Sequence, residues 1–202
     1  MPEPTNRLLS RLTVNLALDV RRGRKGAFER LVRDHQDALF GYALGLVRDP
    51  ADAQDVTQDA FLRAHRALTA SYDEERCRSL ELRPWLFRIT RNLALNRLRA
   101  RRVAREAPLP EADGYHEAAL RLPSAAEGML VGHERRQRLE QALGRLDREA
   151  REIVQLRFVQ SLSYAEIAAV AGGSEAAARG KVFRALARLR AHLTQEEACH
   201  AM

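Results

Sequence analysis

Arginine and lysine side chains are concentrated in two stretches of this sequence that contain no acid. The stretch RPWLFRITRNLALNRLRARRVAR, from Arg83 to Arg105, holds eight arginines without one aspartate or glutamate, and no acid lies between Arg179 and His192. Like charges one turn apart on a helix repel each other by roughly a few tenths of a kcal/mol, so an anionic partner is needed to offset this cost. Guanidinium groups bind phosphate and the guanine edge. The residue chemistry therefore predicts nucleic-acid binding.

The stretch from Arg83 to Arg105 is predicted to be one long helix, with Pro84 in its first turn. Its apolar positions predict a buried stripe that consists of Leu86, Ile89, Leu93 and Ala100. The outer face carries guanidinium and carboxamide groups, from Arg88, Arg91, Asn92, Asn96, Arg99 and Arg102. A carboxamide can donate to and accept from an adenine edge while arginine holds phosphate. This face is a candidate DNA-reading surface.

Three aromatic residues, Tyr72, Trp85 and Phe87, lie near the start of this helix. Such rings can stack on unpaired bases, but a tryptophan at the start of an amphipathic helix is more often part of the core, which is the favoured interpretation. The preceding segment SYDEERCRSLEL is predicted to be a loop. Its acids, among them Asp73 and Glu74, could capture an exocyclic amine of a base.

The second cationic stretch forms part of a helix-turn-helix pattern. Ser163 and Glu166 have the spacing of a capping box, the pair Gly172-Gly173 predicts a tight turn, and Ser174 can cap the following helix. One stripe of that helix is apolar, with Ala178, Val182, Ala185, Leu186, Leu189 and Leu193. A basic flank lies beside it, with Arg179, Lys181, Arg184, Arg188 and Arg190. The pattern predicts a helix for the major groove, although a solvated amphipathic helix remains open from this segment alone.

An acidic helical face is predicted between Ala51 and Leu68. The packing side carries Ala53, Val56, Ala60 and Ala64, and the opposite side carries Asp52, Asp55, Gln58, Asp59, Leu62 and Arg66. A leucine among exposed acids is typical of a docking surface, but a solvated surface is an equal alternative on physical grounds. Asp52 alone could serve only to compensate the helix dipole.

The remaining pattern predicts an all-α fold of two small helical domains joined by a flexible linker. A helix from Gly26 to Arg48 ends at Asp49-Pro50, and no strand pattern competes with the helical periodicity. We divide the chain into an N-terminal extension (1–25), a first domain (26–105), an acidic linker (106–133), a helix-turn-helix domain (134–195) and a tail (196–202). The linker has several prolines and glycines, and its acids are Glu106, Glu111, Asp113, Glu117 and Glu127 against one basic residue, Arg121.

Composition narrows the function classes. The 202 residues include 34 Lys and Arg against 27 Asp and Glu, a net charge of +7 that favours a polyanionic partner. Cys77 and Cys199 form no metal-binding or disulfide pattern, so we expect the protein to reside in the reducing cytoplasm. No apolar run is long enough to insert into a membrane. His35 lies on an apolar stripe and is expected to be a core-edge histidine and not a metal ligand. No catalytic motif is present, so we expect neither an enzyme nor a cofactor.

The order of these parts resembles a bacterial RNA polymerase sigma factor of the extracytoplasmic-function type. The resemblance rests on DAQDVTQDAFLRA, then RPWLFRITRNLALNRLRARR, then LEQALGRLDREAREIVQLRFVQSLSYAEIAAVAGGSEAAARGKVFRALARLR, and it covers about Ala27 to Leu193. It implies that the first domain binds core RNA polymerase and the promoter minus-10 element, and that the second binds the minus-35 element. The linker would thread the polymerase cleft, and an anti-sigma factor is a further expected partner.

The resemblance also implies residue roles. Core polymerase binding falls on Asp52, Asp55, Gln58, Asp59 and Leu62, of which Asp55, Gln58 and Asp59 match the family's polar docking positions. Binding to minus-10 DNA falls on Arg88, Arg91, Asn92, Asn96 and Arg99, and binding to minus-35 DNA falls on Ser174, Arg179, Lys181, Arg184 and Arg188. The alternative function is a two-domain helix-turn-helix regulator that acts without core polymerase.

Overall fold

The computed structural model describes residues 16–106, 139 and 141–200, and these divide into two compact units on either side of segment 107–138. Every regular element of the described residues is a helix, which confirms the all-α, two-domain prediction. The predicted linker, apart from Glu106 at its start, and the first part of the N-terminal extension lie outside the described residues. Each unit is described by itself below.

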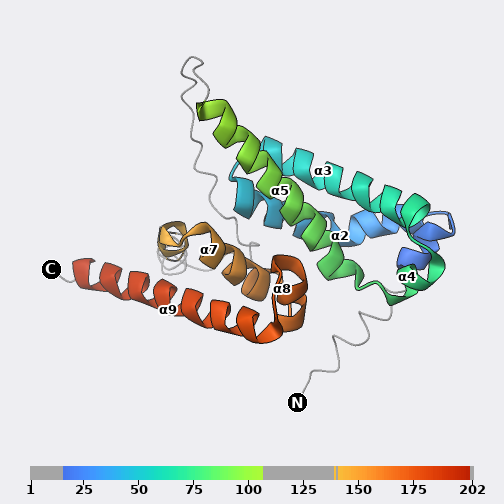
Figure 1. Ribbon diagram of the computed structural model, residues 1–202. Coiled ribbons are helices and arrows are strands. Elements are labelled where there is room, and N and C mark those ends of the chain that lie inside the picture. The colour runs from blue at the N-terminus through green and yellow to red at the C-terminus, as the bar shows by residue number, and fades with distance from the viewer. Residues whose placement is uncertain (1–15, 107–138, 140, 201–202) are drawn as a thin grey trace, which may run out of the picture. The chain divides into compact units, whose positions relative to one another are not determined.

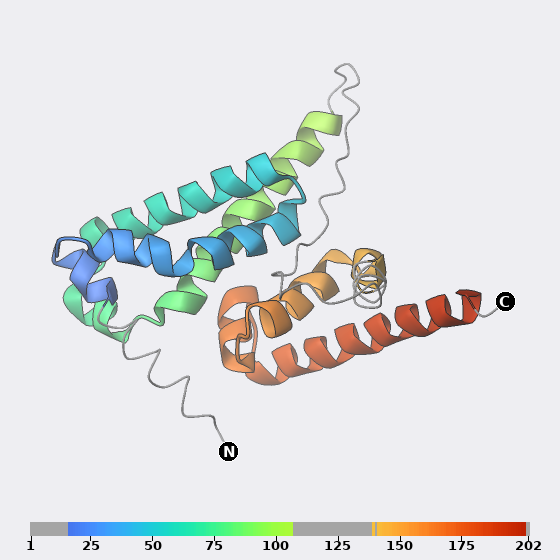
Figure 2. The same ribbon diagram turned by 180° about the vertical axis from the view of Figure 1, so that it is seen from behind.

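The first unit is built on three long helices that pack against one another: α2 (Ala27–Val47), α3 (Pro50–Arg66) and α5 (Leu82–Glu106) (Figure 1). Its core contains large side chains with no exposed surface, including Leu31, Leu39, Tyr42, Leu86 and Phe87. The rings of Tyr42 and Phe87 meet edge to face with centroids 5.2 Å apart. The opposite view shows α2 and α3 running side by side (Figure 2). The sequence predicted all three helices, each to within a few residues.

The break between α2 and α3 is set by two residues. Asp49 is the N-cap of α3 and accepts a hydrogen bond from the backbone N–H of Asp52 at 2.9 Å, while Pro50 occupies the first turn of that helix. Proline at this position loses no hydrogen bond that the helix needs, and its fixed φ favours helix initiation. The Asp49-Pro50 pair therefore ends one helix and starts the next.

The segment predicted as a loop before α5 contains helical structure, so that prediction is wrong. A π-helical turn, η1 (Ala67–Ser71), extends α3, and a short helix, α4 (Glu74–Ser79), follows. Asp73 caps α4 by accepting from the backbone N–H of Arg76 at 2.8 Å. Cys77 is the one buried residue of α4. Because a polar cap and not an apolar stripe starts this helix, hydrophobic periodicity did not reveal it.

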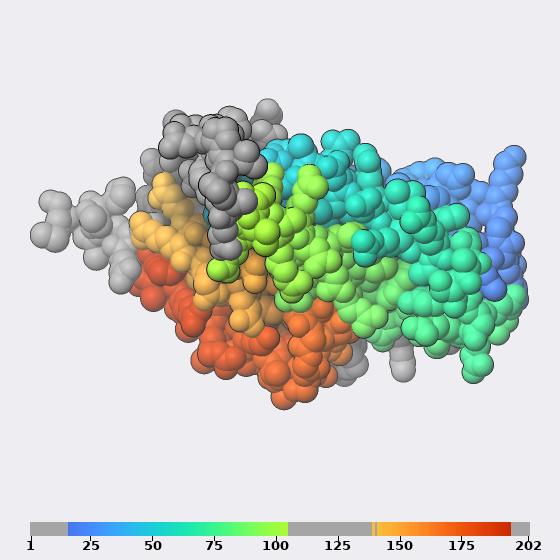
Figure 3. All heavy atoms as spheres, turned by 45° about the horizontal axis from the view of Figure 1, so that its top comes forward, coloured from blue at the N-terminus to red at the C-terminus, as the bar shows by residue number. Residues whose placement is uncertain are grey.

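Part of the predicted N-terminal extension belongs to the core of the first unit. Residues 16–21 are helical, and Leu16, Ala17 and Val20 are buried. Figure 3 shows these first described residues, in blue, against the blue-green segment that follows α3. The part of the predicted extension from residue 16 onward is therefore packed into the first unit.

The aromatic residues near the start of α5 are structural. Trp85 is 6% exposed and donates from Nε1 to Tyr72 Oη at 3.2 Å, while Phe87 is fully buried. The core interpretation of Trp85 is confirmed. His35 is also buried, and desolvation lowers its pKa. Neither Trp85 nor Phe87 has a ring face available for a base.

The second unit contains a helical stretch at 141–145, then α7 (Arg148–Val154), a π-helical turn η2 (Gln155–Val159), α8 (Tyr164–Ala171) and α9 (Glu175–His200). Its core joins Leu143, Leu146 and Val154 to Ala185 and Leu189 of α9. Because α9 continues through His200, the predicted tail starts as helix and not as a separate segment.

The helix-turn-helix prediction is confirmed in its local geometry. Ser163 and Glu166 form both hydrogen bonds of the capping box at the start of α8. Gly172 and Gly173 have φ values of 83° and 108°, which a residue with a side chain adopts only under strain. The two glycines therefore permit the sharp turn between α8 and α9.

Arg151 ties together the start of the second unit. This buried side chain donates to the backbone carbonyls of Leu143, Gly144 and Leu146, at 2.9, 2.8 and 2.6 Å. These carbonyls lie at or just after the end of the 141–145 helix, where the helix no longer supplies a full set of backbone N–H donors; of the three, Leu143 also accepts from the N–H of Leu146 at 3.3 Å. One guanidinium group thus caps that helix.

Replacing Arg151 with methionine keeps the apolar stem but removes the donor, so we expect the second unit to lose about 2 kcal/mol of unfolding free energy. Trp85, the single tryptophan, lies in the first unit and provides an internal control. In urea, the tryptophan fluorescence transition should not change, while the circular-dichroism transition of the second unit should move to lower urea. An unchanged circular-dichroism curve would contradict this role.

Candidate nucleic-acid and protein interfaces

The outer face of α3 carries an exposed polar surface around one leucine. Asp55, Gln58 and Asp59 are exposed, and Leu62 next to them is 52% exposed. Residues three, four and seven positions apart lie on the same side of a helix, so these four side chains form one continuous surface. The side chains predicted to form a docking surface are therefore exposed on one side of α3, with the exception of Asp52.

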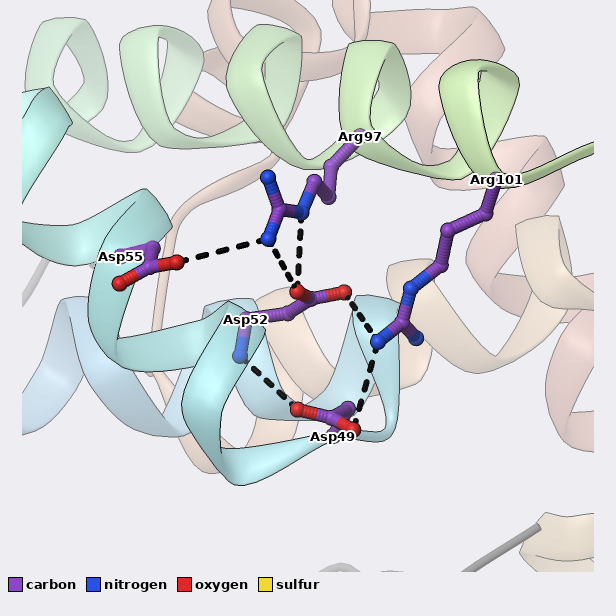
Figure 4. Close-up of polar contacts among 5 residues, drawn as sticks. All are labelled: Asp49, Asp52, Asp55, Arg97 and Arg101. Carbon is purple, nitrogen blue, oxygen red and sulfur yellow. Dashed lines mark hydrogen bonds and ion pairs between the residues drawn. The ribbon is translucent and has the colours of Figure 1, made fainter. Parts of the chain in front are cut away.

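Asp52 is buried, with 4% of its surface exposed. Its Oδ1 accepts a hydrogen bond from Nε of Arg97 at 2.8 Å, and its Oδ2 lies 2.6 Å from Nη2 of Arg101 (Figure 4). A carboxylate in this position presents almost no surface to solvent. Because Asp52 is buried and paired within the unit, it is not part of the exposed surface formed by Asp55, Gln58, Asp59 and Leu62.

The two arginines extend this contact into a network of five charges. Arg97 Nη2 lies 3.4 Å from Oδ2 of Asp55, and Arg101 Nη2 lies 3.3 Å from Oδ2 of Asp49 (Figure 4). The hydrogen bond from the Asp52 N–H, followed by Arg101, holds the pKa of Asp49 below its ordinary value. The network fastens the C-terminal half of α5 to the start of α3. Sequence reasoning missed it, because its partners are more than 40 residues apart along the chain.

The outer face of α5 presents the predicted polar side chains. Arg88, Asn92, Asn96, Arg99 and Arg102 are exposed, and Arg91 is half-buried. Asn96 accepts a hydrogen bond from Arg99 at 3.2 Å, which aligns the two side chains along one line of the helix. This face combines guanidinium donors with carboxamides, as a DNA-reading surface requires.

The predicted buried stripe of α5 is right at Leu86 and Leu93 but wrong at Ala100, which is exposed. Arg101 pairs with Asp49, the residue before the first turn of α3. The last turns of α5 therefore extend past the helix on which it packs (Figure 1). Nothing in the described first unit covers Ala100 or Val103.

The basic flank of α9 is partly neutralised within the second unit. Lys181 Nζ lies 2.7 Å from Oε1 of Glu149, and Arg179 Nη2 lies 3.3 Å from Oε1 of Glu175. Arg188 forms an ion pair with Asp147 at the start of α7. These acids compete with any anionic ligand for the same cations.

Arg184 differs from these residues, since it is exposed and forms no ion pair with any residue that the structure describes. Ser174 caps α9 by accepting from the backbone N–H of Ala177 at 3.2 Å, so its hydroxyl marks the positive end of the helix dipole. Together the two residues place an unpaired cation and a helix N-terminus on one element.

Sequence reasoning missed Phe183, which is 74% exposed on α9. It borders a shallow groove with Ala176, Arg179, Gly180 and Arg184. The available signal was its place on the helical wheel, where it falls between Val182 of the buried stripe and Arg184 of the basic flank. An aromatic ring there provides apolar contact beside the cations.

Within the described ranges, no group of three His, Cys, Asp or Glu side chains could hold a metal ion, and no helix is long and apolar enough to cross a membrane. Burial raises the pKa of the Cys77 thiol. The side chain of Cys199 lies outside the described residues.

Two family models match this chain. Residues 31–103 match Sigma-70 region 2 and residues 136–189 match Sigma-70, region 4. The chain is 33% identical over 195 residues to RNA polymerase sigma factor CnrH of Cupriavidus metallidurans, covering 95% of this chain and 96% of that protein. It is 31% identical over 170 residues to the ECF RNA polymerase sigma-E factor of Escherichia coli K12, covering 82% and 86%.

A third relative, the probable RNA polymerase sigma factor RfaY of Xanthomonas campestris pv. campestris, is 35% identical over 176 residues. The match spans 86% of this chain and 42% of that protein. In three dimensions the chain is similar to CnrH solved in complex with the cytosolic domain of CnrY. The TM-score is 0.64 at 31% identity, over 91% of this chain and 97% of that one.

The network around Asp52 yields a stability prediction. Asp52→Asn keeps the shape of the side chain but leaves two guanidinium groups facing a neutral amide. Loss of one partner of a buried ion pair costs about 3–5 kcal/mol, and because both arginines are half exposed we expect a loss of about 2 kcal/mol. Urea unfolding followed by Trp85 fluorescence measures it.

The matched control is Asp55→Asn, whose carboxylate is exposed and more distant from Arg97. Exposed ion pairs contribute little, so this variant should change the unfolding free energy by less than about 0.5 kcal/mol. Equal destabilisation by the two substitutions would contradict the central place of Asp52.

Proposed function

This chain belongs to the sigma-70 family of RNA polymerase sigma factors, in its extracytoplasmic-function branch, and we propose that it binds core polymerase and directs it to promoters through their minus-35 and minus-10 elements. Members of the family are initiation factors and not catalysts. One observation carries the proposal: the two units present exposed cationic helix faces, on α5 and on α9, in the family's order of regions 2 and 4.

Core polymerase binds the outer face of α3 in this proposal. Asp55, Gln58 and Asp59 supply charge and hydrogen-bond acceptors around the apolar contact of Leu62, as expected for a protein interface. Asp52 is buried beneath this surface and binds Arg97, which also contacts Asp55. The docking helix and the DNA-binding helix are therefore parts of one rigid structure.

Minus-10 DNA binds the outer face of α5. Arg88, Arg91 and Arg99 contact phosphates, while Asn92 and Asn96 contact base edges of the opened strand. Unstacking a base costs a few kcal/mol, and phosphate contacts together with capture of the base offset that cost. We propose that the turn around α4, directly before α5, receives the captured base.

Minus-35 DNA binds α9 as a major-groove recognition helix. Arg184 is available without losing an internal partner, whereas Arg179, Lys181 and Arg188 exchange a carboxylate for a phosphate. Ser174 caps the N-terminus of α9, whose positive dipole end faces the DNA phosphate backbone in this proposal. Phe183 adds apolar contact in the groove, where thymine methyl groups lie.

An anti-sigma protein is a further proposed partner, on the pattern of CnrH, which was solved with the cytosolic domain of CnrY. We propose that it covers the polymerase-binding and DNA-binding faces and so holds the factor inactive in the cytoplasm. A helix-turn-helix regulator acting without core polymerase is the competing function. A gel shift with and without core polymerase separates the two, because a sigma factor of this type needs the core to bind its promoter stably.

The division of labour predicts opposite effects for two variants. Arg184→Ala should lower run-off transcription by about tenfold, the effect of losing one good DNA contact, while core polymerase binding stays unchanged. Asp55→Ala should weaken core binding several-fold while duplex contacts of the second unit stay intact. The promoter comes from run-off transcription with core polymerase on a genomic fragment library. Equal loss of both activities in either variant contradicts the assignment.

The internal acids of the second unit predict a gain of affinity. Glu149 pairs with Lys181 and repels phosphate, so Glu149→Gln should strengthen holoenzyme binding to the promoter by about two- to fivefold, as for an exposed charge. Fluorescence anisotropy of the labelled promoter at constant salt measures this. Lys181→Gln is the paired variant and should weaken binding by a similar factor, and weaker binding of Glu149→Gln would refute the competition.

A further inference from the structure

The first described residues of the chain contact the segment between α3 and α5. Arg21 donates from Nη1 to the backbone carbonyl of Thr69 in η1. Arg22 holds the Glu74 carboxylate with two N–H groups along one edge of its guanidinium group, Nε to Oε1 at 3.0 Å and Nη2 to Oε2 at 2.7 Å. Such a two-point contact fixes direction as well as distance. Two consecutive arginines therefore attach the N-terminal helix to the turn that precedes α5.

The short helix α4 has little else to hold it in place. One of its six residues, Cys77, is buried, so apolar packing contributes little to its position. Glu74 is its first residue and also accepts from Arg78 one turn later at 2.6 Å. The Arg78 contact stays within α4 and cannot place it relative to the rest of the unit. The tertiary attachment of this helix at its first turn is the pair between Glu74 and Arg22.

The same turn is also attached to α5. Tyr72 accepts from the Trp85 indole at 3.2 Å, and the Arg76 guanidinium lies 4.1 Å from the centre of the Tyr72 ring. The turn is therefore held from two sides, by α5 through Tyr72 and by the N-terminal helix through Arg21 and Arg22. The N-terminal helix is itself anchored, because Leu16, Ala17 and Val20 are buried.

We propose that residues 16–22 form a brace for the α4 turn, and that Arg22 is a positioning residue for the capture of the unpaired minus-10 base. The inference rests on the proposed function, since the α4 turn is where that function places the base. Arg22 acts through Glu74 and does not itself contact DNA. The hydrogen bond from Arg22 also holds the pKa of Glu74 below its ordinary value, so the contact persists to more acidic pH than an unpaired glutamate would allow.

The same segment offers a matched control. Arg24, two residues further along, pairs with Asp19 at 2.8 Å within the N-terminal segment. It has the same charge and is more exposed to solvent, with 60% of its side chain accessible against 39% for Arg22, but its partner Asp19 is not in α4. A general effect of basic charge near the DNA would appear in Arg24 variants as well as in Arg22 variants, whereas an effect of position would appear in Arg22 variants alone.

The test uses holoenzyme assembled from core polymerase and the full-length chain. The probe is the single-stranded minus-10 segment of the promoter found by run-off transcription, with each of the four bases placed in turn at the captured position. For Arg22→Ala we expect the preference for the correct base to fall by about two- to fivefold, the range that an exposed ion pair supplies. Binding of core polymerase and of the duplex minus-35 element should not change.

Two further variants separate positioning from folding. Arg22→Lys keeps one contact to Glu74 and should recover most of the preference, and Arg24→Ala should equal the unaltered protein. Glu74→Gln breaks the same pair from the other side. The double variant Arg22→Ala, Glu74→Gln should lose no more base preference than the more strongly affected of the two single variants. Trp85 fluorescence unfolding checks that each variant is folded.

The outcomes are distinct. If the unaltered holoenzyme starts transcription but Arg22→Ala keeps full base preference, the brace is refuted while the proposed function stands. If additive losses appear in the double variant, Arg22 does not act through Glu74 and the inference is again refuted. If the unaltered protein forms no holoenzyme that initiates transcription, the proposed function itself fails.

Discussion

The buried carboxylate of Asp52 is the constraint on which the first unit depends. Taking a carboxylate out of water costs several kcal/mol unless opposite charges and hydrogen bonds replace the lost hydration. Arg97 supplies a hydrogen bond and an opposite charge at 2.8 Å, Arg101 supplies a second opposite charge at 2.6 Å, and both arginines come from a different helix. The two helices therefore have one low-energy arrangement, in which the exposed acids of α3 and the exposed cations of α5 are held at a fixed separation. A factor that must hold an enzyme and a DNA strand together requires such rigidity.

Both units divide their basic residues between internal and external partners. In α5, Arg97 and Arg101 face acids of α3, while Arg88 and Arg99 face solvent. In α9, Lys181 and Arg188 pair with acids near or in α7, while Arg184 has no acidic partner among the described residues. Internal acids reduce the self-repulsion of a highly basic helix, and they also discriminate among ligands, because an anion must compete with a carboxylate already in place.

Much of the fold followed from local patterns. The capping box at Ser163, the Asp49-Pro50 boundary and the apolar period of α2 depend on residues within one or two turns of each other, so the sequence reveals them directly. The short helix α4 was missed because it depends on one cap and on distant arginines and has no apolar stripe. Ala100 was misassigned for a related reason: periodicity shows which side of a helix is apolar, but not where the neighbouring helix ends.

The sequence alone determined the long helices of this protein, its two cationic faces and their order. Its family follows from these, because charge pattern and helical period are properties of consecutive residues. The tertiary structure alone decided which charges are available to a partner. Asp52 and Asp55 are three residues apart and chemically identical, yet one is buried between two arginines and the other is exposed. That difference arises from a helix 45 residues further along the chain, and no local pattern contains it.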